Sequence, residues 1–190
     1  YAPPDACACF LTVKAPGFVA IAPQSGPTSG MAFPEQPVLQ RGAASGREFE
    51  QASTSGAWPM YRHDPKRTGA TQGALPEFPT LRWSVPLGGR LTQPVVVGDT
   101  VIVASVDTHT VHALSAADGR ELWHHTVGGR VDSAPTIHAG SVLFGAADGW
   151  VTCLDARDGA SVWRFRAAPE ERLVNAYGQL ESTWPVHGSV

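Results

Sequence analysis

Histidines and cysteines are the side chains of this chain that could ligate a metal or carry redox chemistry, and it has 7 His and 3 Cys. His124 and His125 are adjacent, so on a strand they point to opposite faces and do not easily bind one ion together. Four further histidines lie on different predicted strands and loops: His109, His112, His138 and His187. This scatter favours structural or exposed histidines, and we assign no metal-binding residue.

The cysteines leave two alternatives open. Cys7 and Cys9 form a C-x-C pair. On an extended strand their Cα atoms would be about 6.5–7 Å apart, at the limit of disulfide geometry. They are either ordinary strand cysteines or cysteines that take part in redox or disulfide chemistry with a partner. Cys153 alternates with Val151 and Asp155 in an apolar stretch, which favours a small core residue.

Common catalytic signatures are absent from the 190-residue sequence: it has no G-x-S-x-G, H-E-x-x-H, phosphate loop or dinucleotide fingerprint. We therefore assign no catalytic and no cofactor-binding residue. A run of charged side chains follows Tyr61, and a solvated, capped turn explains it better than a ligand site: Arg62, His63, Asp64, Lys66 and Arg67. The net charge of −3 gives no reason to expect nucleic-acid binding. No apolar run reaches the roughly 18 residues of a membrane span.

A 40-residue repeat organises the second half of the chain. Trp83, Trp123 and Trp163 are spaced 40 residues apart. The Gly-Gly-Arg triplet at 88–90 recurs at 128–130. Such self-similarity at a fixed period is the signature of repeat architectures.

Each repeat unit is predicted to form four short strands, because short alternating segments are separated by Gly-containing turns. The Asp-Gly dipeptides supply the positive φ of tight hairpins. The predicted strands are Pro94–Val97, Thr100–Ser105, Thr110–Ser115 and Glu121–Thr126, then Pro135–His138, Ser141–Ala146, Trp150–Asp155 and Ser161–Arg166.

Four-stranded units of this length predict β-propeller blades, since one such sheet cannot bury both faces alone. The tryptophan of the fourth strand is large enough to fill the gap between blades. We predict an all-β chain, a partial β-propeller of four-stranded antiparallel blades with an irregular Pro/Gly-rich N-terminal half. The predicted organisation is a strand pair at 1–22 closing a preceding domain, a flexible linker at 23–57, a lead-in at 58–80, two blades at 81–166, and a loop insertion with the start of the next blade at 167–190. The segment 169–182 is expected to be a loop or a short helix.

The runs "VHALSAADGRELW" and "VTCLDARDGASVW" resemble the PQQ-type repeat of quinoprotein alcohol dehydrogenases and of propeller-type outer-membrane assembly lipoproteins. The lead-in "WPMYRHDPKRTG" is similar to the opening segment of such propellers, and the chain also resembles large PQQ-like repeat proteins of planctomycete type. The start at Tyr1 and the strand-like end at Val190 indicate a fragment of a larger protein.

The resemblance implies that certain loops share one face of the propeller. By this carry-over one rim is expected to hold Arg90, Arg130, Asp107, His109, Asp148, Trp150 and the insertion 169–182. The two arginines either hold a carboxylate or other anion, or are solvated side chains of a turn that the repeat imposes.

We interpret the chain as a non-catalytic binding or interaction scaffold, with a protein partner or small ligand on the loop face. The alternatives are part of a quinoprotein alcohol dehydrogenase that uses PQQ and calcium, or an accessory propeller of a larger enzyme. We expect no cofactor for the scaffold, because the repeat indicates a fold and does not by itself indicate a chemical activity. The resemblance implies a periplasmic or otherwise extracytoplasmic location.

Overall fold

The computed structural model describes residues 38–49, 56–71, 73–74, 76–176 and 178–190. The predictions for 1–22, including Cys7 and Cys9, and for most of the linker lie outside these residues. The described residues form strands and turns and contain no helix. The strands are β1 Leu39–Arg41, β2 Val95–Val97, β3 Thr100–Ser105, β4 Thr110–Ser115, β5 Glu121–Thr126, β6 Thr136–His138, β7 Ser141–Gly145, β8 Trp150–Asp155, β9 Ser161–Arg166, β10 Leu173–Ala176 and β11 Gln179–Ser182. None of the described segments could cross a membrane as an apolar helix.

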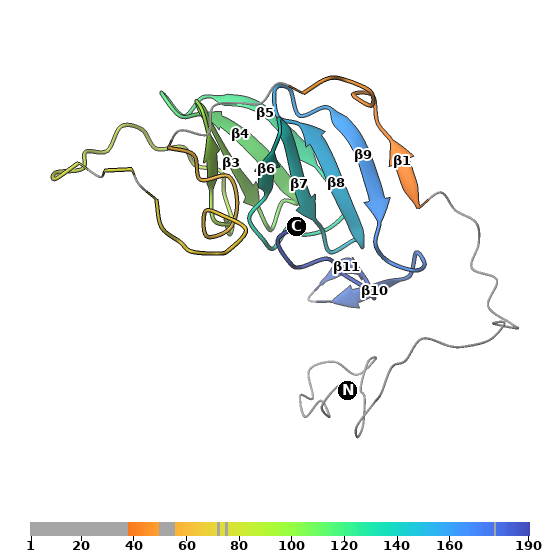
Figure 1. The fold of residues 1–190 in the computed structure, drawn as a ribbon. Coiled ribbons are helices and arrows are strands. Elements are labelled where there is room, and N and C mark those ends of the chain that lie inside the picture. The colour runs from red at the N-terminus through yellow and green to blue at the C-terminus, as the bar shows by residue number, and fades with distance from the viewer. Residues whose placement is uncertain (1–37, 50–55, 72, 75, 177) are drawn as a thin grey trace, which may run out of the picture. The chain divides into compact units, whose positions relative to one another are not determined.

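The two predicted blades are two antiparallel sheets, ordered β2-β3-β4-β5 and β6-β7-β8-β9 (Figure 1). The first strand of each begins one residue after the predicted Pro94 and Pro135. Proline has no N–H to donate to a ladder, which explains the later start. β7 ends at Gly145 rather than at Ala146. The other five of the eight predicted strands keep their bounds.

The core lies between the two blades. Ile102 and Val111 of the first blade and Phe144 and Leu154 of the second belong to one cluster and are fully buried. These residues are apolar at alternate positions of their strands, so each sheet turns one apolar face to the other. Trp123, at the edge of the first blade, joins the same cluster.

The tryptophans connect neighbouring units, as predicted. The indole Nε1–H of Trp123 donates to the Ala156 carbonyl at 2.9 Å, and that of Trp83 donates to the Ala116 carbonyl at the same distance. Each ring also covers a turn glycine: a Cβ on Gly159 would lie 2.6 Å from the Trp123 ring. The 40-residue spacing therefore has a packing cause: the tryptophan ring of one unit lies against a turn glycine of the next unit, where a side chain would not fit.

A fifth strand extends the second blade. β1 pairs antiparallel with β9, with Gln40 opposite Arg164 (Figure 1), and the guanidinium Nε of Arg164 donates to Gln40 Oε1 at 2.7 Å. Ala44, which follows β1, is fully buried in a small cluster with Cys153. Cys153 is thus a core residue, as predicted. β1 lies inside the segment 23–57, for which the sequence predicts a flexible linker. The strand forms by pairing with β9, which is far away in the chain, so the local composition of the segment does not indicate it.

Ion pairs fasten this segment to the blade. Asp155, whose side chain is fully buried, lies 2.8 Å from Arg157 Nη2 and 3.1 Å from Arg47 Nη1. Arg47 also contacts Asp158 at 2.8 Å. The hydrogen bonds from Arg157, opposed by burial and supported by Arg47, hold the pKa of Asp155 well below its ordinary value of 3.8.

The depressed pKa predicts how stability depends on pH. A carboxyl with a lower pKa in the folded state contributes stability above its unfolded pKa and loses it as the pH falls through the folded pKa. The Asp155→Asn variant should therefore melt at a lower temperature than the wild type at pH 7, and this gap should narrow below about pH 3.8. Thermal unfolding from pH 7 to pH 3 measures it, with the exposed Glu77→Gln as control. A gap that is constant over this range would contradict the prediction.

The lead-in spans the innermost strands of both blades. Trp58 forms a two-bond bridge with Val96 of β2, and the carbonyl of Pro59 accepts from the N–H of Ile137 in β6 at 2.7 Å. The charged turn that follows is capped from within, as predicted. The hydroxyl of Thr68 donates to Asp64 and, as the main cause, lowers the pKa of that carboxyl to about 2.

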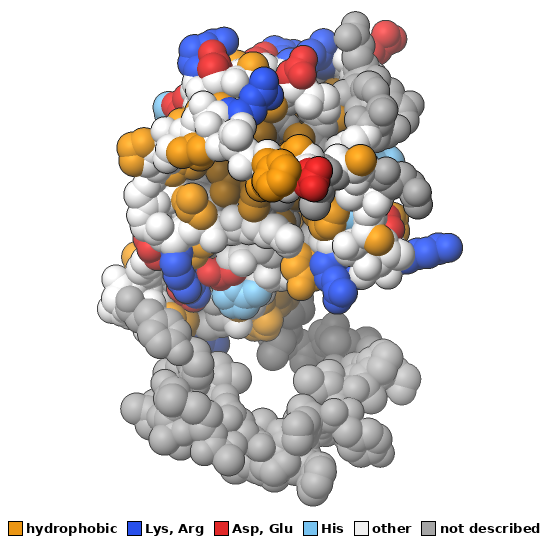
Figure 2. All heavy atoms as spheres, turned by 90° about the vertical axis from the view of Figure 1, so that its left-hand side faces the viewer, with side chains coloured by type: hydrophobic (Ala, Val, Ile, Leu, Met, Phe, Trp, Pro, Cys, Tyr) orange, Lys and Arg blue, Asp and Glu red, His pale blue; other side chains and the backbone are white. Residues whose placement is uncertain are grey.

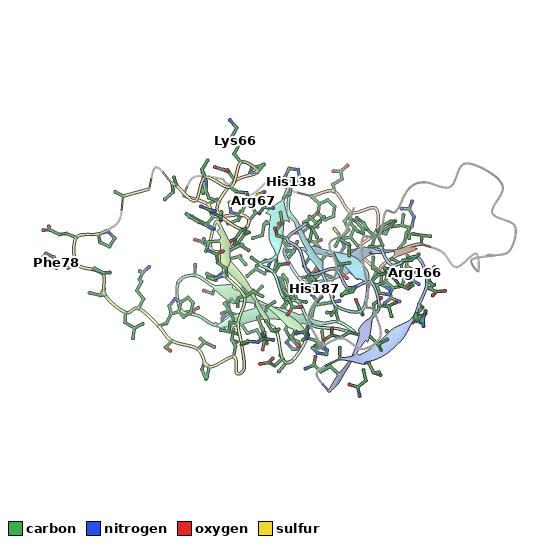
Figure 3. All side chains as sticks on the ribbon, turned by 90° about the horizontal axis from the view of Figure 1, so that it is seen from below. Lys66, Arg67, Phe78, His138, Arg166 and His187 are labelled. Atoms are coloured by element: carbon green, nitrogen blue, oxygen red, sulfur yellow. The ribbon has the colours of Figure 1, made fainter. Side chains whose placement is uncertain are left out.

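Arg62 and Lys66 of this turn are exposed, whereas the His63 ring packs edge-on against Trp58 with ring centroids 5.2 Å apart. Arg67 donates to the Tyr61 carbonyl at 2.9 Å, and Lys66 projects outward (Figure 3). On the side of the molecule that Figure 2 shows, hydrophobic side chains are mixed with charged ones rather than gathered in one field. The charged turn therefore remains a solvated surface feature.

The insertion after the second blade is a two-stranded hairpin, β10–β11, in which Val174 pairs with Glu181. The short-helix alternative for 169–182 is wrong. Gly178 supplies a positive φ of 79° in the turn, and the hairpin is anchored by the bond from the Ser182 N–H to the Ala147 carbonyl at 2.7 Å. Tertiary contacts at this edge outweigh the local helix signal of Pro169 and its two glutamates.

Candidate functional site

Turns of both repeat units meet at the end of the sheets that carries the β3–β4 and β7–β8 loops. The N–H of Val106 donates to the Arg90 carbonyl at 2.8 Å, and the N–H of Ala147 donates to the Arg130 carbonyl at the same distance. The repeat therefore places each Gly-Gly-Arg triplet against the loop after the second strand of its own blade. This is the rim that the resemblance implied.

An aspartate in each loop holds the facing triplet. Asp107 Oδ2 accepts the backbone N–H of Arg90 at 2.9 Å, and a Cβ on Gly89 would lie 2.8 Å from the same oxygen. In the second blade Asp148 faces the first glycine of the triplet instead, since a Cβ on Gly128 would lie 2.8 Å from Asp148 Oδ2. Burial raises the pKa of Asp148, against the backbone hydrogen bonds that it accepts. Both aspartates shape turns.

A pocket of about 460 Å³ opens on this rim, lined by Arg90, Asp107, Arg130 and Gln179. We call it the rim pocket. Its fourth lining residue comes from the hairpin, and Gln179 Oε1 lies 3.1 Å from His109 Nε2. The structure thus brings together four of the predicted rim residues, counting His109, with the insertion.

The two arginines differ in their surroundings. The Arg90 side chain is 65% exposed and lies 3.5 Å from Asp107 Oδ1. The Arg130 side chain is only 16% exposed and pairs through Nε with Glu181 at 2.7 Å. Asp132 lies 3.6 Å from Arg130 Nη1 and binds His187 at 2.8 Å. The prediction of a solvated arginine describes Arg90 and is wrong for Arg130.

Trp150 does not line the rim pocket. Its ring is buried in β8, with the Arg164 guanidinium 4.3 Å above it. The residues that complete the rim, Gln179, Glu181 and Asp132, were not singled out in the sequence. The insertion 169–182 was singled out as a whole. The hairpin register that turns Gln179 and Glu181 to the same side, however, depends on strand pairing that the sequence does not reveal.

Loss of the Glu181 carboxylate should loosen the hairpin. Breaking a buried pair from one side leaves the remaining charge poorly compensated, here Arg130 with only Asp132 at 3.6 Å. We expect Glu181→Gln to increase the rate of proteolysis within 173–182 by about tenfold, because local opening becomes easier. Mass spectrometry of the fragments measures it, and Glu171→Gln, exposed outside the hairpin strands, is the control. Equal cleavage rates in the two variants would count against this role.

Two histidines share one carboxylate on the first blade. His112 and His124 are cross-strand partners, and their Nδ1 atoms lie 2.7 and 2.9 Å from the Glu121 carboxylate. These hydrogen bonds lower the pKa of Glu121. The described residues contain no group of three potential ligands that could hold a metal ion. In the sequence His124 stands next to His125, and His112 was not recognised as its cross-strand partner because the strand register is not visible there.

The lining of the rim pocket does not fit calcium, the metal of the PQQ alternative. Calcium takes six to eight oxygen ligands. Only Asp107 and Gln179 offer side-chain oxygens there, and those are engaged with Arg90 and His109. No chemical step through PQQ and calcium follows from the residues that the structure describes.

Comparisons with known proteins agree with the architecture. A family model described as "Outer membrane protein assembly factor BamB" (PQQ_2) matches residues 49–184. BamB of Salmonella typhimurium is 29% identical over 48% of this chain and 27% of its own length. The DNA damage-responsive serine/threonine-protein kinase RqkA of Deinococcus radiodurans is 37% identical over 60% of this chain and 17% of its own length.

Among solved structures, quinohemoprotein alcohol dehydrogenase from Comamonas testosteroni superposes with a TM-score of 0.51 and 23% identity, over 61% of this chain and 20% of that one. This likeness shows the fold alone. The chain spans about a quarter or less of the length of these relatives. Together with the two sheets, the comparisons confirm an all-β partial propeller of PQQ-like repeats.

Proposed function

We propose, since this chain belongs to the PQQ-like repeat family described as outer membrane protein assembly factor BamB, that it is a non-catalytic scaffold that binds a partner protein at its rim. The proposal extends to an extracytoplasmic location, in keeping with the outer-membrane role that the BamB name states. A related assembly factor with the same repeat supports a binding role.

The proposal rests on how the charged side chains of the rim are used. Its aspartates and Arg130 are engaged in contacts that shape the turns and hold the hairpin. Such contacts make a rigid frame rather than a set of reactive groups. The frame surrounds an open pocket, and Leu180, which follows the lining residue Gln179 on β11, is 62% exposed. Loops held on a rigid scaffold are the usual place for recognition.

Photo-crosslinking in the full-length protein that carries this chain tests the proposal. A photoreactive residue at position 180 should give one discrete crosslinked protein in cells. The same residue at position 122, where Leu122 is exposed on β5, should not. The crosslinked protein, once purified, should bind the wild type directly. Identical products from positions 180 and 122 would contradict a partner site at the rim.

The quinoprotein alternative has its own readout. The full-length protein is incubated with PQQ and Ca²⁺, and dye reduction with alcohols is followed. Dye reduction that requires PQQ would overturn the non-catalytic proposal, whatever the crosslinks show. We expect no PQQ-dependent rate above that of the heat-denatured protein.

A further inference from the structure

We propose that the rim pocket binds a carboxylate of the partner, either its C-terminal group or an Asp or Glu side chain. This inference rests on the proposed function, because it names the ligand chemistry of the same site. It follows from which hydrogen-bonding atoms of the pocket are engaged and which are left.

The acceptor atoms of the lining are already engaged. Asp107 Oδ2 accepts from the backbone N–H of Arg90 at 2.9 Å, and Oδ1 faces the Arg90 guanidinium at 3.5 Å. Gln179 Oε1 is 3.1 Å from His109 Nε2, and it accepts when that nitrogen carries the proton. A ligand that needs acceptors, such as a cation or an amine, therefore finds few in this pocket.

The donor atoms remain. With its oxygen turned to His109, Gln179 keeps both protons of its amide nitrogen for a ligand. Arg90 pairs through one terminal nitrogen only, and Arg130 pairs through Nε and Nη1. The remaining guanidinium nitrogens of both arginines have no partner among the residues that the structure describes. The pocket thus presents donors from three side chains, which suits a group made of acceptors.

The two guanidinium groups favour an anion among the possible acceptors. Glu181 and Asp132 lie beside Arg130, so the preference comes from the guanidinium nitrogens left without a partner and not from a net positive charge of the pocket. Arginine and carboxylate form charge-assisted, often bidentate pairs. Arg130 is preorganised for such a pair, because Glu181 and Asp132 hold its side chain in place. Arg90 is largely exposed and is expected to close on the ligand.

Three peptides test the inference on the full-length protein, each labelled with rhodamine at its N-terminus. The first is Gly-Ser-Gly-Ser-Ala with a free C-terminus, the second is the same peptide amidated, and the third is an amidated peptide with Glu in the middle. Fluorescence anisotropy at low salt should show binding of the first, the third or both. The amidated neutral peptide should bind about tenfold more weakly. The pair of acidic probes distinguishes a C-terminal from a side-chain carboxylate.

Variants assign the binding to the pocket. Gln179→Glu keeps the shape of the side chain but replaces donors by acceptors and charge, so it should weaken binding by about tenfold. Arg90→Gln should weaken it by about threefold, since its side chain is exposed. Arg120→Gln, exposed in the turn at the opposite end of the first blade, is the matched control and should leave the affinity unchanged.

The outcomes separate the inference from the proposed function. Equal binding of all three peptides, or of none, would overturn the carboxylate inference even if crosslinks from position 180 succeed. Carboxylate-dependent binding that Gln179→Glu leaves intact would also overturn it. Selective binding that the Gln179→Glu variant loses, without a crosslinked partner protein, would support the inference and count against the protein scaffold.

Discussion

Replacing Gly159 by alanine is expected to lower the free energy of unfolding by about 3 kcal/mol. The backbone of Gly159 has a φ of +70°, which costs an L-residue about 1 kcal/mol. A Cβ would also lie 2.6 Å from the Trp123 ring. That ring is buried between the blades and bonded to the Ala156 carbonyl, so it cannot move aside freely. Overpacking of this kind adds roughly 1–3 kcal/mol.

A second glycine separates the two causes. Gly98 also has a positive φ, of 56°, but a Cβ there would meet nothing within 4 Å. Gly98→Ala should therefore cost only the backbone term of about 1 kcal/mol. Denaturant unfolding of the full-length protein, followed by tryptophan fluorescence, measures both variants. Equal losses for Gly98→Ala and Gly159→Ala would show that the ring–glycine contact does not stabilise the blade interface.

Truncation of Phe144 is expected to cost about 3–5 kcal/mol, the range for removing a large buried aromatic side chain. Phe144 is fully buried on β7, in the cluster that joins the two blades. It packs in the same cluster as Ile102 and Leu154, so alanine would leave a cavity bounded by both sheets. Rigid strands on either side limit how far the cavity can collapse.

The matched control is Phe78→Ala. Phe78 is 80% exposed in the lead-in and projects away from the blades (Figure 3), so the change in unfolding free energy should stay within about 0.5 kcal/mol. The same unfolding measurement applies. A loss below about 1 kcal/mol for Phe144→Ala would contradict a shared core between the blades.

It was possible to predict which loops form the candidate site, but not which side chains contact one another there. The resemblance to PQQ-type propellers implied that Arg90, Asp107, Arg130 and His109 share one rim, and the structure brings them together there. Their pairing was not predictable: Arg130 looks equivalent to Arg90 in the sequence, yet only Arg130 finds a buried carboxylate. That carboxylate belongs to an insertion that the other repeat unit lacks.

The sequence alone determined the blades, because their information is local. Alternating apolar residues, Gly turns and tryptophans at a 40-residue spacing recur within each unit, and a strand of period two needs no distant partner to show its inner face. The tertiary structure alone decided how β1 adds to β9, how the insertion becomes a hairpin, and why the hairpin closes the rim. Gln40 and Arg164 are 124 residues apart. Contacts at such separations depend on which strand edges and charged side chains come together after folding, and no local sequence pattern indicates which of them will do so.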